Sequence, residues 1–247
     1  MNLLILNASP KKKGGASRFF SGVLRRMLPG VHTKTLSLHN RGDFKKALEQ
    51  LSGVDAVCFS LPLYVDGLPS HLVEFLKLAE EHCKTHRCQF RVYGLLNNGF
   101  VEGRQNKPAL HMLQAWCERS GLTWGGGVGI GGGVMLHALG IIYSILLTAI
   151  VLYMGVSYLT TGIVADSLWL TLWTQICVWL FLNIGMLFCM GRLAIAIRKR
   201  GCLPNQFTRV MIPGFVFLVF ADLFMVFSSL FRGRFVFRLL KKDSWPG

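Results

Sequence analysis

The first 135 residues alternate between short apolar runs and amphipathic segments. The apolar runs predict five strands, at residues 2–7, 31–36, 56–60, 91–96 and 124–130. The segments between them predict four helices, at residues 17–28, 44–51, 70–81 and 108–120. Ser17 and Ser70 are the expected N-caps of two of these helices. Strands that alternate with helices indicate an α/β fold with a parallel, doubly wound sheet of five strands.

The pattern changes at Leu136, where long runs without formal charge begin. Residues 136–159 and 168–190 contain no Asp, Glu, Lys or Arg. Each run exceeds the roughly 20 residues that cross the hydrocarbon core of a bilayer. The connection TTGIVADS is short and nearly uncharged. Residues 136–190 therefore predict a transmembrane hairpin of two helices, with this connection on the far side of the membrane.

The remaining residues leave two topologies open. The sequence predicts that residues 191–209, which are rich in Arg and Lys, form a basic cytoplasmic loop. Residues 210–247 contain a third apolar helix, interrupted by Pro213, Gly214 and Asp222, and a basic tail. Charge favours two full crossings, with this helix re-entrant or interfacial, whereas hydropathy alone favours three. In both cases the domain of residues 1–135 lies on the cytoplasmic side of a multi-pass cell-membrane protein.

Composition narrows the partners. The formal net charge is +15, and much of this excess flanks the apolar runs, where the positive-inside bias explains it. There is neither zinc-finger spacing nor the aromatic and basic strip of an RNA-binding sheet, so we expect membrane lipid rather than nucleic acid as a partner. The seven cysteines are scattered, which fits a reducing compartment better than a disulfide framework.

Three loops follow predicted strands and carry the candidate chemistry. The carboxyl ends of parallel strands meet at one edge, where ligands bind in doubly wound folds. After the first strand, Ser9, Lys11 and Ser17 lie in a small-residue loop that enters a helix, as a phosphate-binding loop does. The alternative is a solvated basic turn.

The other two loops carry flat and polar groups. After the third strand come Pro62, Leu63, Tyr64 and Val65, a rigid turn that can hold one face of a ring system. After the fourth come Asn97, Asn98, Gly99 and Phe100, which offer donors, acceptors and a stacking face. Alternatively, both are ordinary connections, since Asn-Gly is a common turn pair. The cluster of His and Cys at residues 82–88 lacks a second pair of ligands, and we assign it no metal.

Four segments carry a resemblance to a known family. ILNASPKKKGGAS, PLYVDGLPS, LLNNGFVEGRQN and GGGVGIGGGVML resemble the NAD(P)H-dependent FMN reductases and flavodoxin-like oxidoreductases over about residues 1–136. The resemblance implies a flavodoxin-like fold, FMN as cofactor and NAD(P)H as electron donor. It implies that residues 9–17 hold the FMN phosphate, and that residues 62–66 and 97–100 flank the isoalloxazine ring. A homodimer is also implied, because relatives commonly dimerise.

The chain departs from the family pattern in two places. Ala8 and the group Gly15–Ala16–Ser17 stand where family members commonly have Gly and an Asn-Thr or Ser-Asn-Thr group. The apolar spans stand where an amphipathic helix normally follows the fifth strand. A weak similarity of MIPGFVFLVFADLF to a Pro-containing C-terminal helix of soluble relatives would instead make the spans an insertion within the domain.

These features support three functions. The first is a membrane-anchored oxidoreductase that passes electrons from NAD(P)H through FMN to a quinone, a flavin or another acceptor, including a protein. The second is a flavodoxin-type electron-transfer subunit of a membrane complex without NAD(P)H activity. The third is a non-redox membrane protein that retains the fold. Because the flavin carries the redox chemistry, the sequence assigns no catalytic side chain.

Overall fold

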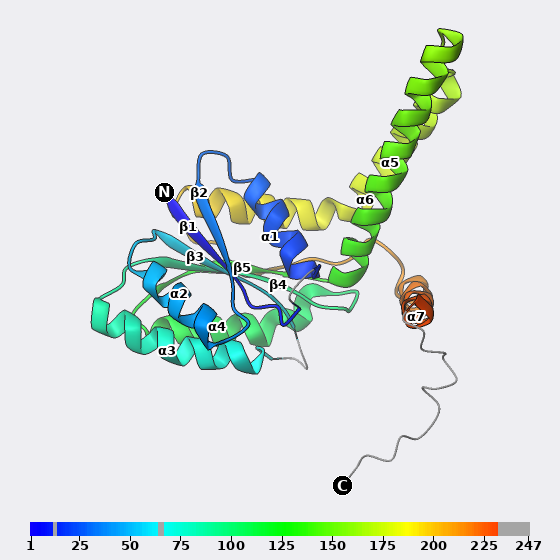
Figure 1. Ribbon diagram of the computed structural model, residues 1–247. Helices are drawn as coiled ribbons and strands as arrows, with labels where there is room; N and C mark the ends of the chain where they lie inside the picture. The colour runs from blue at the N-terminus through cyan, green and yellow to red at the C-terminus, as the bar shows by residue number, and fades with distance from the viewer. Residues whose placement is uncertain (12–13, 64–66, 232–247) are drawn as a thin grey trace, which may run out of the picture. The chain divides into compact units, whose positions relative to one another are not determined.

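The structure, a computed structural model, describes residues 1–11, 14–63 and 67–231 (Figure 1). Within these residues, six parallel strands form one sheet in the order β2-β1-β3-β4-β5-β6. The strands are β1 (Asn2–Asn7), β2 (His32–Ser37), β3 (Ala56–Pro62), β4 (Arg91–Asn97), β5 (Thr123–Ile130) and β6 (Gln206–Phe207). The first five have the flavodoxin-like order 2-1-3-4-5, which confirms the predicted fold class.

The glycine-rich run in β5 permits close packing. The register between β4 and β5 shifts after Val92, so that Tyr93 pairs with Gly126. A side chain at Gly125 would collide with the ring of Tyr93. Gly126 has φ +104°, a conformation that favours glycine. The run is therefore a strand, as predicted, and the structure adds a bulge in its pairing with β4.

Four helices cross between the strands, close to the predicted positions. They are α1 (Ala16–Arg26), α2 (Arg41–Leu51), α3 (Ser70–His86) and α4 (Lys107–Arg119), the last preceded by the short 3-10 helix η1 (Gly103–Asn106). The predicted N-caps were wrong: Gly15 caps α1 and Pro69 caps α3, so Ser17 and Ser70 lie inside their helices. The helix α2 begins earlier than predicted, because the Asn40 side chain accepts a hydrogen bond from the Asp43 N–H at 2.9 Å.

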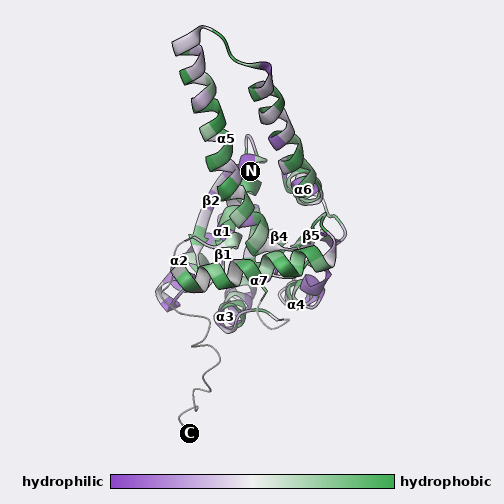
Figure 2. Ribbon diagram, turned by 90° about the vertical axis from the view of Figure 1, so that its right-hand side faces the viewer, coloured by the Kyte–Doolittle hydropathy of each residue, from purple (hydrophilic) through white to green (hydrophobic). Residues whose placement is uncertain are grey.

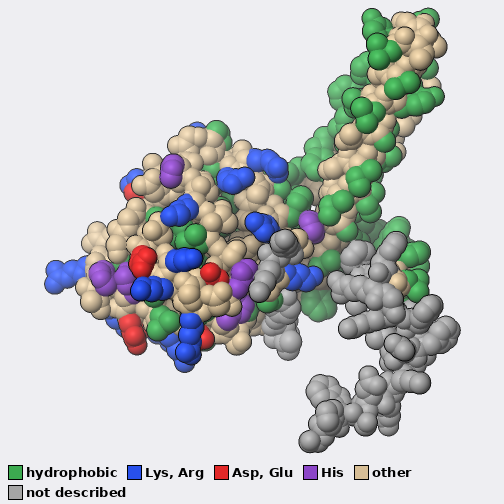
Figure 3. Space-filling view, viewed as in Figure 1, with side chains coloured by type: hydrophobic (Ala, Val, Ile, Leu, Met, Phe, Trp, Pro, Cys, Tyr) green, Lys and Arg blue, Asp and Glu red, His purple; other side chains and the backbone are tan. Residues whose placement is uncertain are grey.

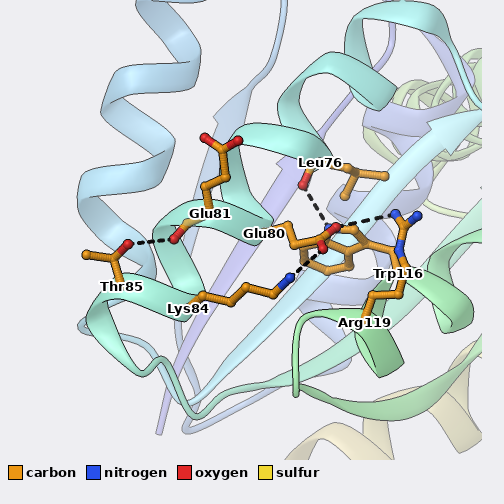
Figure 4. A network of polar contacts seen from close by, with 7 residues as sticks. All are labelled: Leu76, Glu80, Glu81, Lys84, Thr85, Trp116 and Arg119. Atoms are coloured by element: carbon orange, nitrogen blue, oxygen red, sulfur yellow. Dashed lines mark hydrogen bonds and ion pairs between the residues drawn. The ribbon is translucent and has the colours of Figure 1, made fainter.

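The helices α2, α3 and α4 cover one face of the sheet (Figure 1). The indole of Trp116 donates to the Leu76 carbonyl at 2.8 Å, which ties α4 to α3 (Figure 4). Beside it, Glu80 pairs with Lys84 at 2.7 Å and with Arg119 at 3.4 Å. The hydrogen bond from Lys84, together with the two positive charges, lowers the pKa of Glu80. Polar contacts therefore close this layer over the apolar core.

After β5 the chain forms a long helical hairpin of α5 (Gly133–Thr161) and α6 (Asp166–Arg198). Hydrophobic residues run along both arms (Figure 2). Within the described residues, these are the two helices long and apolar enough to cross a membrane, by length and composition. Both begin and end near the predicted spans, but each is longer.

The end of α6 belongs to the α/β domain. Figure 1 shows α6 changing direction below the hairpin, so that its last turns lie on the sheet beside α1. Met190, Leu193 and Ile197 are buried there. Since the chain returns to the sheet after the hairpin, the hairpin lies between two parts of one compact unit. The prediction that residues 191–209 form a loop was wrong, because these residues contain the last turns of α6 and the strand β6.

Residues 1–211 form one compact unit, and residues 212–247 belong to a second, which is described by itself. Its helix α7 (Gly214–Phe231) carries Asp222, which is exposed. The predicted interruption by Pro213 and Gly214 lies just before and at the start of this helix.

Tyr93 joins the sheet to the docked end of α6. Its buried hydroxyl donates to the carbonyls of Ala196 and Gly201, at 3.2 and 2.8 Å. Burial raises the pKa of Tyr93 to about 12. Tyr93→Phe is therefore expected to lower the free energy of unfolding at neutral pH by about 1–2 kcal/mol.

The pH dependence of the stability difference between the wild type and Tyr93→Phe identifies the contribution of the Tyr93 hydroxyl. Because the pKa in the folded protein exceeds that of the unfolded chain, the contribution is complete below about pH 10 and is lost as the pH rises towards 12. Urea unfolding of both proteins from pH 8 to 11.5 is expected to show their difference narrowing above about pH 10. A difference that stays constant or widens over this range would contradict the role assigned to Tyr93.

Candidate functional site

The three candidate loops lie side by side at the carboxyl edge of the sheet. The Ala8 N–H donates to Ser60 O at 2.9 Å, and the Leu63 N–H donates to Asn97 O at 2.7 Å. These bonds extend the pairing of β1, β3 and β4 beyond the strands themselves. The hairpin starts at the same edge, since α5 begins at Gly133 directly after β5. The three loops therefore meet at one edge of the sheet, as predicted, and α5 starts from the same edge.

Among the described residues, no side chain caps the backbone N–H groups at the start of α1. Its N-cap is Gly15, which makes no side-chain capping bond, and its first turn contains no acidic residue. The N–H groups of such a helix end attract an anion. A Cβ at Gly15 would lie 3.3 Å from Ser9 Oγ, a tight contact. Glycine therefore keeps the space between the first loop and the helix start open.

Ser9 lies beneath this loop. It is buried, its N–H donates to Asn7 Oδ1 at 3.0 Å, and its Oγ accepts from the Lys11 N–H at 3.4 Å. Because the Ser9 hydroxyl is the acceptor in its bond with the Lys11 N–H, its own proton remains available for a ligand oxygen. Lys11 is exposed and adds positive charge to the loop. The prediction that Ser9 and Lys11 bind a phosphate is compatible with these positions and stays a prediction.

Ser17 also makes hydrogen bonds that the sequence did not indicate. It is 1% exposed, and its Oγ accepts from Asn97 Nδ2 at 2.9 Å. Its carbonyl accepts from the Ser60 hydroxyl, also at 2.9 Å. Ser17 therefore fastens α1 to β3 and β4 by accepting hydrogen bonds at its hydroxyl and its carbonyl, and its hydroxyl proton is not used in either bond.

The asparagines of the fourth-strand loop also bond internally. Asn97 Nδ2 donates to Leu61 O at 3.1 Å as well as to Ser17. Asn98 donates to Glu102 O at 2.9 Å and accepts from the Phe100 N–H at 3.2 Å. Both side chains are buried, whereas Phe100 is 54% exposed. The groups that this loop presents outward are therefore the Phe100 ring and the backbone around Gly99.

The third-strand loop is described only in part. Pro62 closes β3 and pairs in register with Asn97, and Leu63 follows it half-buried. Tyr64 and Val65, which the sequence singled out, lie outside the described residues, as does Asp66. The described part of this loop adjoins the Asn97 loop, as the prediction of a shared ring site requires.

Sequence reasoning missed several residues at this edge. Asn7 and Ser60 are buried polar groups inside apolar strands, a signal that was available but was not used. His71 of α3 places Nε2 3.2 Å from Ala8 O. Burial, aided by the nearby His39, lowers the pKa of His71. Its imidazole is therefore neutral at pH 7 and contacts the first loop as a hydrogen-bonding group.

A segment from beyond the hairpin holds the fourth-strand loop. The Thr208 carbonyl accepts from the Gly103 N–H at 2.7 Å, and its Oγ1 accepts from the Gly131 N–H at 3.1 Å. The Val210 N–H donates to Val101 O at 3.1 Å. No local pattern in the sequence links these residues, because the bonded pairs are 77 to 109 positions apart.

The cluster at residues 82–88 is a helix end. His82 and His86 stack with ring centroids 4.0 Å apart, and Arg87 ends α3 in the left-handed conformation. Among the described residues, no three His, Cys, Asp or Glu side chains are grouped so that they could hold a metal ion.

The fold and this edge define a flavodoxin-like α/β domain with a helical hairpin inserted before its last helix. No protein-family model and no curated protein matches the chain. Several solved structures are similar to it. An NAD(P)H:quinone oxidoreductase from Methanothermobacter marburgensis is 15% identical with a TM-score of 0.43, and covers 53% of this chain and 87% of its own.

Two further structures give similar values. An NADPH-quinone reductase from P. pentosaceus is 13% identical with a TM-score of 0.44, over 53% of this chain and 86% of its own. An FMN-dependent NADH-azoreductase from Bacillus anthracis, in complex with FMN, is 13% identical with a TM-score of 0.36, over 51% of this chain and 86% of its own. The fold assignment rests on the strand order of this chain.

Proposed function

We propose that this chain is a membrane-anchored, FMN-dependent oxidoreductase that passes electrons from NAD(P)H to a quinone, a flavin or a protein acceptor. The observation that carries the proposal is the open start of α1. There, Gly15, Ser9 and Lys11 combine free backbone donors, a buried hydroxyl and positive charge. This set of groups fits a phosphate monoester.

The neighbouring loops support a site for a flat ring beside that phosphate. Phe100 offers an exposed aromatic face, and the backbone around Gly99 offers hydrogen-bonding groups. Pro62 and Leu63 border the same edge. Bound FMN would accept a hydride and supply all of the redox chemistry. The residues of this chain bind the phosphate, orient the ring and exclude water from it, and none needs to act as an acid or a base.

The hairpin supports membrane anchoring. In the most apolar stretch of α5 only 6% of the residues are buried, whereas a core helix of a soluble protein would be mostly buried. At about 1.5 Å per residue, the part of α5 beyond Gly140 is about 30 Å long, which matches the hydrocarbon core. The basic residues around the end of α6 favour a cytoplasmic domain. A lipid-soluble acceptor and a homodimer accord with this arrangement.

Flavin binding is the first test. The full chain, purified in mild detergent and supplied with FMN, is expected to show flavin absorbance after gel filtration. Ala16→Asp places a carboxylate in the first turn of α1, which favours the helix but repels a phosphate. We expect the affinity of this variant for FMN to be at least about tenfold lower than that of the wild type, which corresponds to about 1.4 kcal/mol of binding free energy. The isosteric, neutral Ala16→Asn is expected to retain it.

Riboflavin, which lacks the phosphate, provides the control: its affinity is expected to be the same in the wild type and in Ala16→Asp. A colourless wild-type protein would overturn both redox functions and leave the non-redox alternative. If FMN binds, stopped-flow mixing with NADH or NADPH is expected to bleach it. A bound flavin that neither nucleotide reduces above background would leave the electron-transfer subunit instead.

A further inference from the structure

The two faces of the α/β domain differ sharply in charge. The helices α2, α3 and α4 together carry seven basic and six acidic side chains. On the other face, α1 and residues 191–200 carry seven basic side chains and no acidic one. The seven are Arg18, Arg25, Arg26, Arg192, Arg198, Lys199 and Arg200, and all are exposed. We call this set the basic face.

Most of these charges have no acidic partner in the domain. Arg200 pairs with Asp55 at 2.9 Å. Among the described residues, the other six take part in no salt bridge. The opposite face instead pairs Arg41, Lys84 and Arg119 with glutamates. In Figure 3 the visible acidic side chains lie on the α/β domain, away from the hairpin.

The hairpin rises from the side of the sheet that bears the basic face (Figures 1 and 2). The first turns of α5 pack on α1, where the rings of Phe19 and His137 lie 5.2 Å apart. A Cβ at Gly140 would come 3.1 Å from the Phe19 ring. The other arm returns to the same side, since α6 passes from the hairpin onto the sheet without leaving its helix.

Apolar surface also continues from the hairpin onto this face. Phe188 and Ile195 are 63% and 52% exposed on the part of α6 that leads to and lies on the sheet. Arg192 lies between them, with its guanidinium carbon 5.9 Å from the centre of the Phe188 ring. Exposed apolar side chains interleaved with unpaired cations are the composition that suits a lipid interface.

We infer that the basic face lies against the anionic headgroups of the membrane that holds the hairpin. This inference rests on the proposed membrane insertion. Clusters of Lys and Arg next to a membrane span are attracted to anionic lipid within about one Debye length, about 8 Å at physiological ionic strength. Contact along α1 and the end of α6 would keep this face of the domain against the membrane. The carboxyl edge of the sheet, where the cofactor is proposed to bind, then lies beside the bilayer surface.

Two exposed aliphatic positions provide a matched test. Ile195 lies on the basic face and Leu78 on α3 of the opposite face. Each is replaced by Cys in the full chain, labelled with a fluorophore and reconstituted in nanodiscs with nitroxide-headgroup lipid. The signal of labelled native cysteines, measured on the unsubstituted protein, is subtracted. With phosphatidylglycerol present, we expect quenching at position 195 to exceed that at position 78 by about twofold or more, and to weaken in high salt.

Charge variants separate lipid attraction from mere proximity. Combined Arg18→Gln, Arg25→Gln and Arg26→Gln is expected to remove most of the excess quenching at position 195. The matched combination Lys45→Gln, Lys46→Gln and Lys77→Gln, on α2 and α3, is expected to leave it unchanged. Equal quenching at positions 195 and 78, or equal effects of the two combinations, would overturn the inference.

A separate measurement tests whether the hairpin is inserted in the membrane at all, independently of where the basic face lies. Resistance of the full chain to alkaline carbonate extraction from cell membranes is expected if the hairpin is inserted. Extraction into the soluble fraction would overturn the anchoring and the inference together. A resistant protein with equal quenching at the two positions would overturn only the inference.

Discussion

A chain that ends after β5, at Gly132, is expected not to fold, although it contains all five predicted strands. It lacks the last turns of α6, which bury Met190, Leu193 and Ile197 against the sheet. Truncating one such side chain to Ala costs about 2–5 kcal/mol. The three together therefore match or exceed the total stability of a typical domain, about 5–15 kcal/mol. Circular dichroism and urea unfolding of the purified fragment show whether it is folded.

An internal deletion provides the control. Replacing residues 141–182 with a flexible Gly/Ser linker removes the exposed part of the hairpin but retains the docked end of α6 and β6. Both proteins are studied in mild detergent, since the control retains the apolar helix α7, and we expect the control to unfold cooperatively in urea. If the fragment ending at Gly132 unfolded with the same midpoint and slope as this control, α6 would not be part of the domain.

Replacing Asn97 with alanine is expected to weaken both the domain and its cofactor edge. The Asn97 amide donates to Ser17 Oγ and Leu61 O, at 2.9 and 3.1 Å, in a buried position. Its loss leaves both acceptors unpaired, at about 1–3 kcal/mol for each buried group. We expect the free energy of unfolding to fall by about 2–4 kcal/mol, since these costs are only partly additive. FMN affinity falls as well, because α1 is no longer fixed to β3 and β4.

A second asparagine serves as the comparison. Asn205 accepts from Trp124 Nε1 at 3.3 Å in a partly exposed position. Asn205→Ala is expected to cost under about 1 kcal/mol and to leave FMN affinity unchanged. The stability change of each variant is measured from the midpoint of its urea unfolding curve, provided that the slope of the transition stays the same as in the wild type. An Asn97→Ala protein as stable as Asn205→Ala would show that the buried amide does not hold the edge together.

The candidate site illustrates what a sequence pattern conveys. Ser9 and Lys11 occupy the places that the loop motif predicts, because small residues between a strand and a helix fold locally. Ser17 and Asn97 share the edge as expected, but their side chains bond to each other. Which way a buried polar group points depends on the partners that other segments bring to it. A motif therefore gives the position of such a residue but not its hydrogen bonds.

Local periodicity alone determined the five main strands, the four crossing helices and the two apolar helices of the hairpin. These signals arise from neighbouring residues, which share one face of a strand or one helix surface. Only the tertiary structure decided that the end of α6 covers the sheet and that Gln206–Phe207 adds a sixth strand. A helix of mixed apolar and basic residues suits a membrane border and a sheet face equally well. Contact with Tyr93, about 100 residues earlier, selects the sheet.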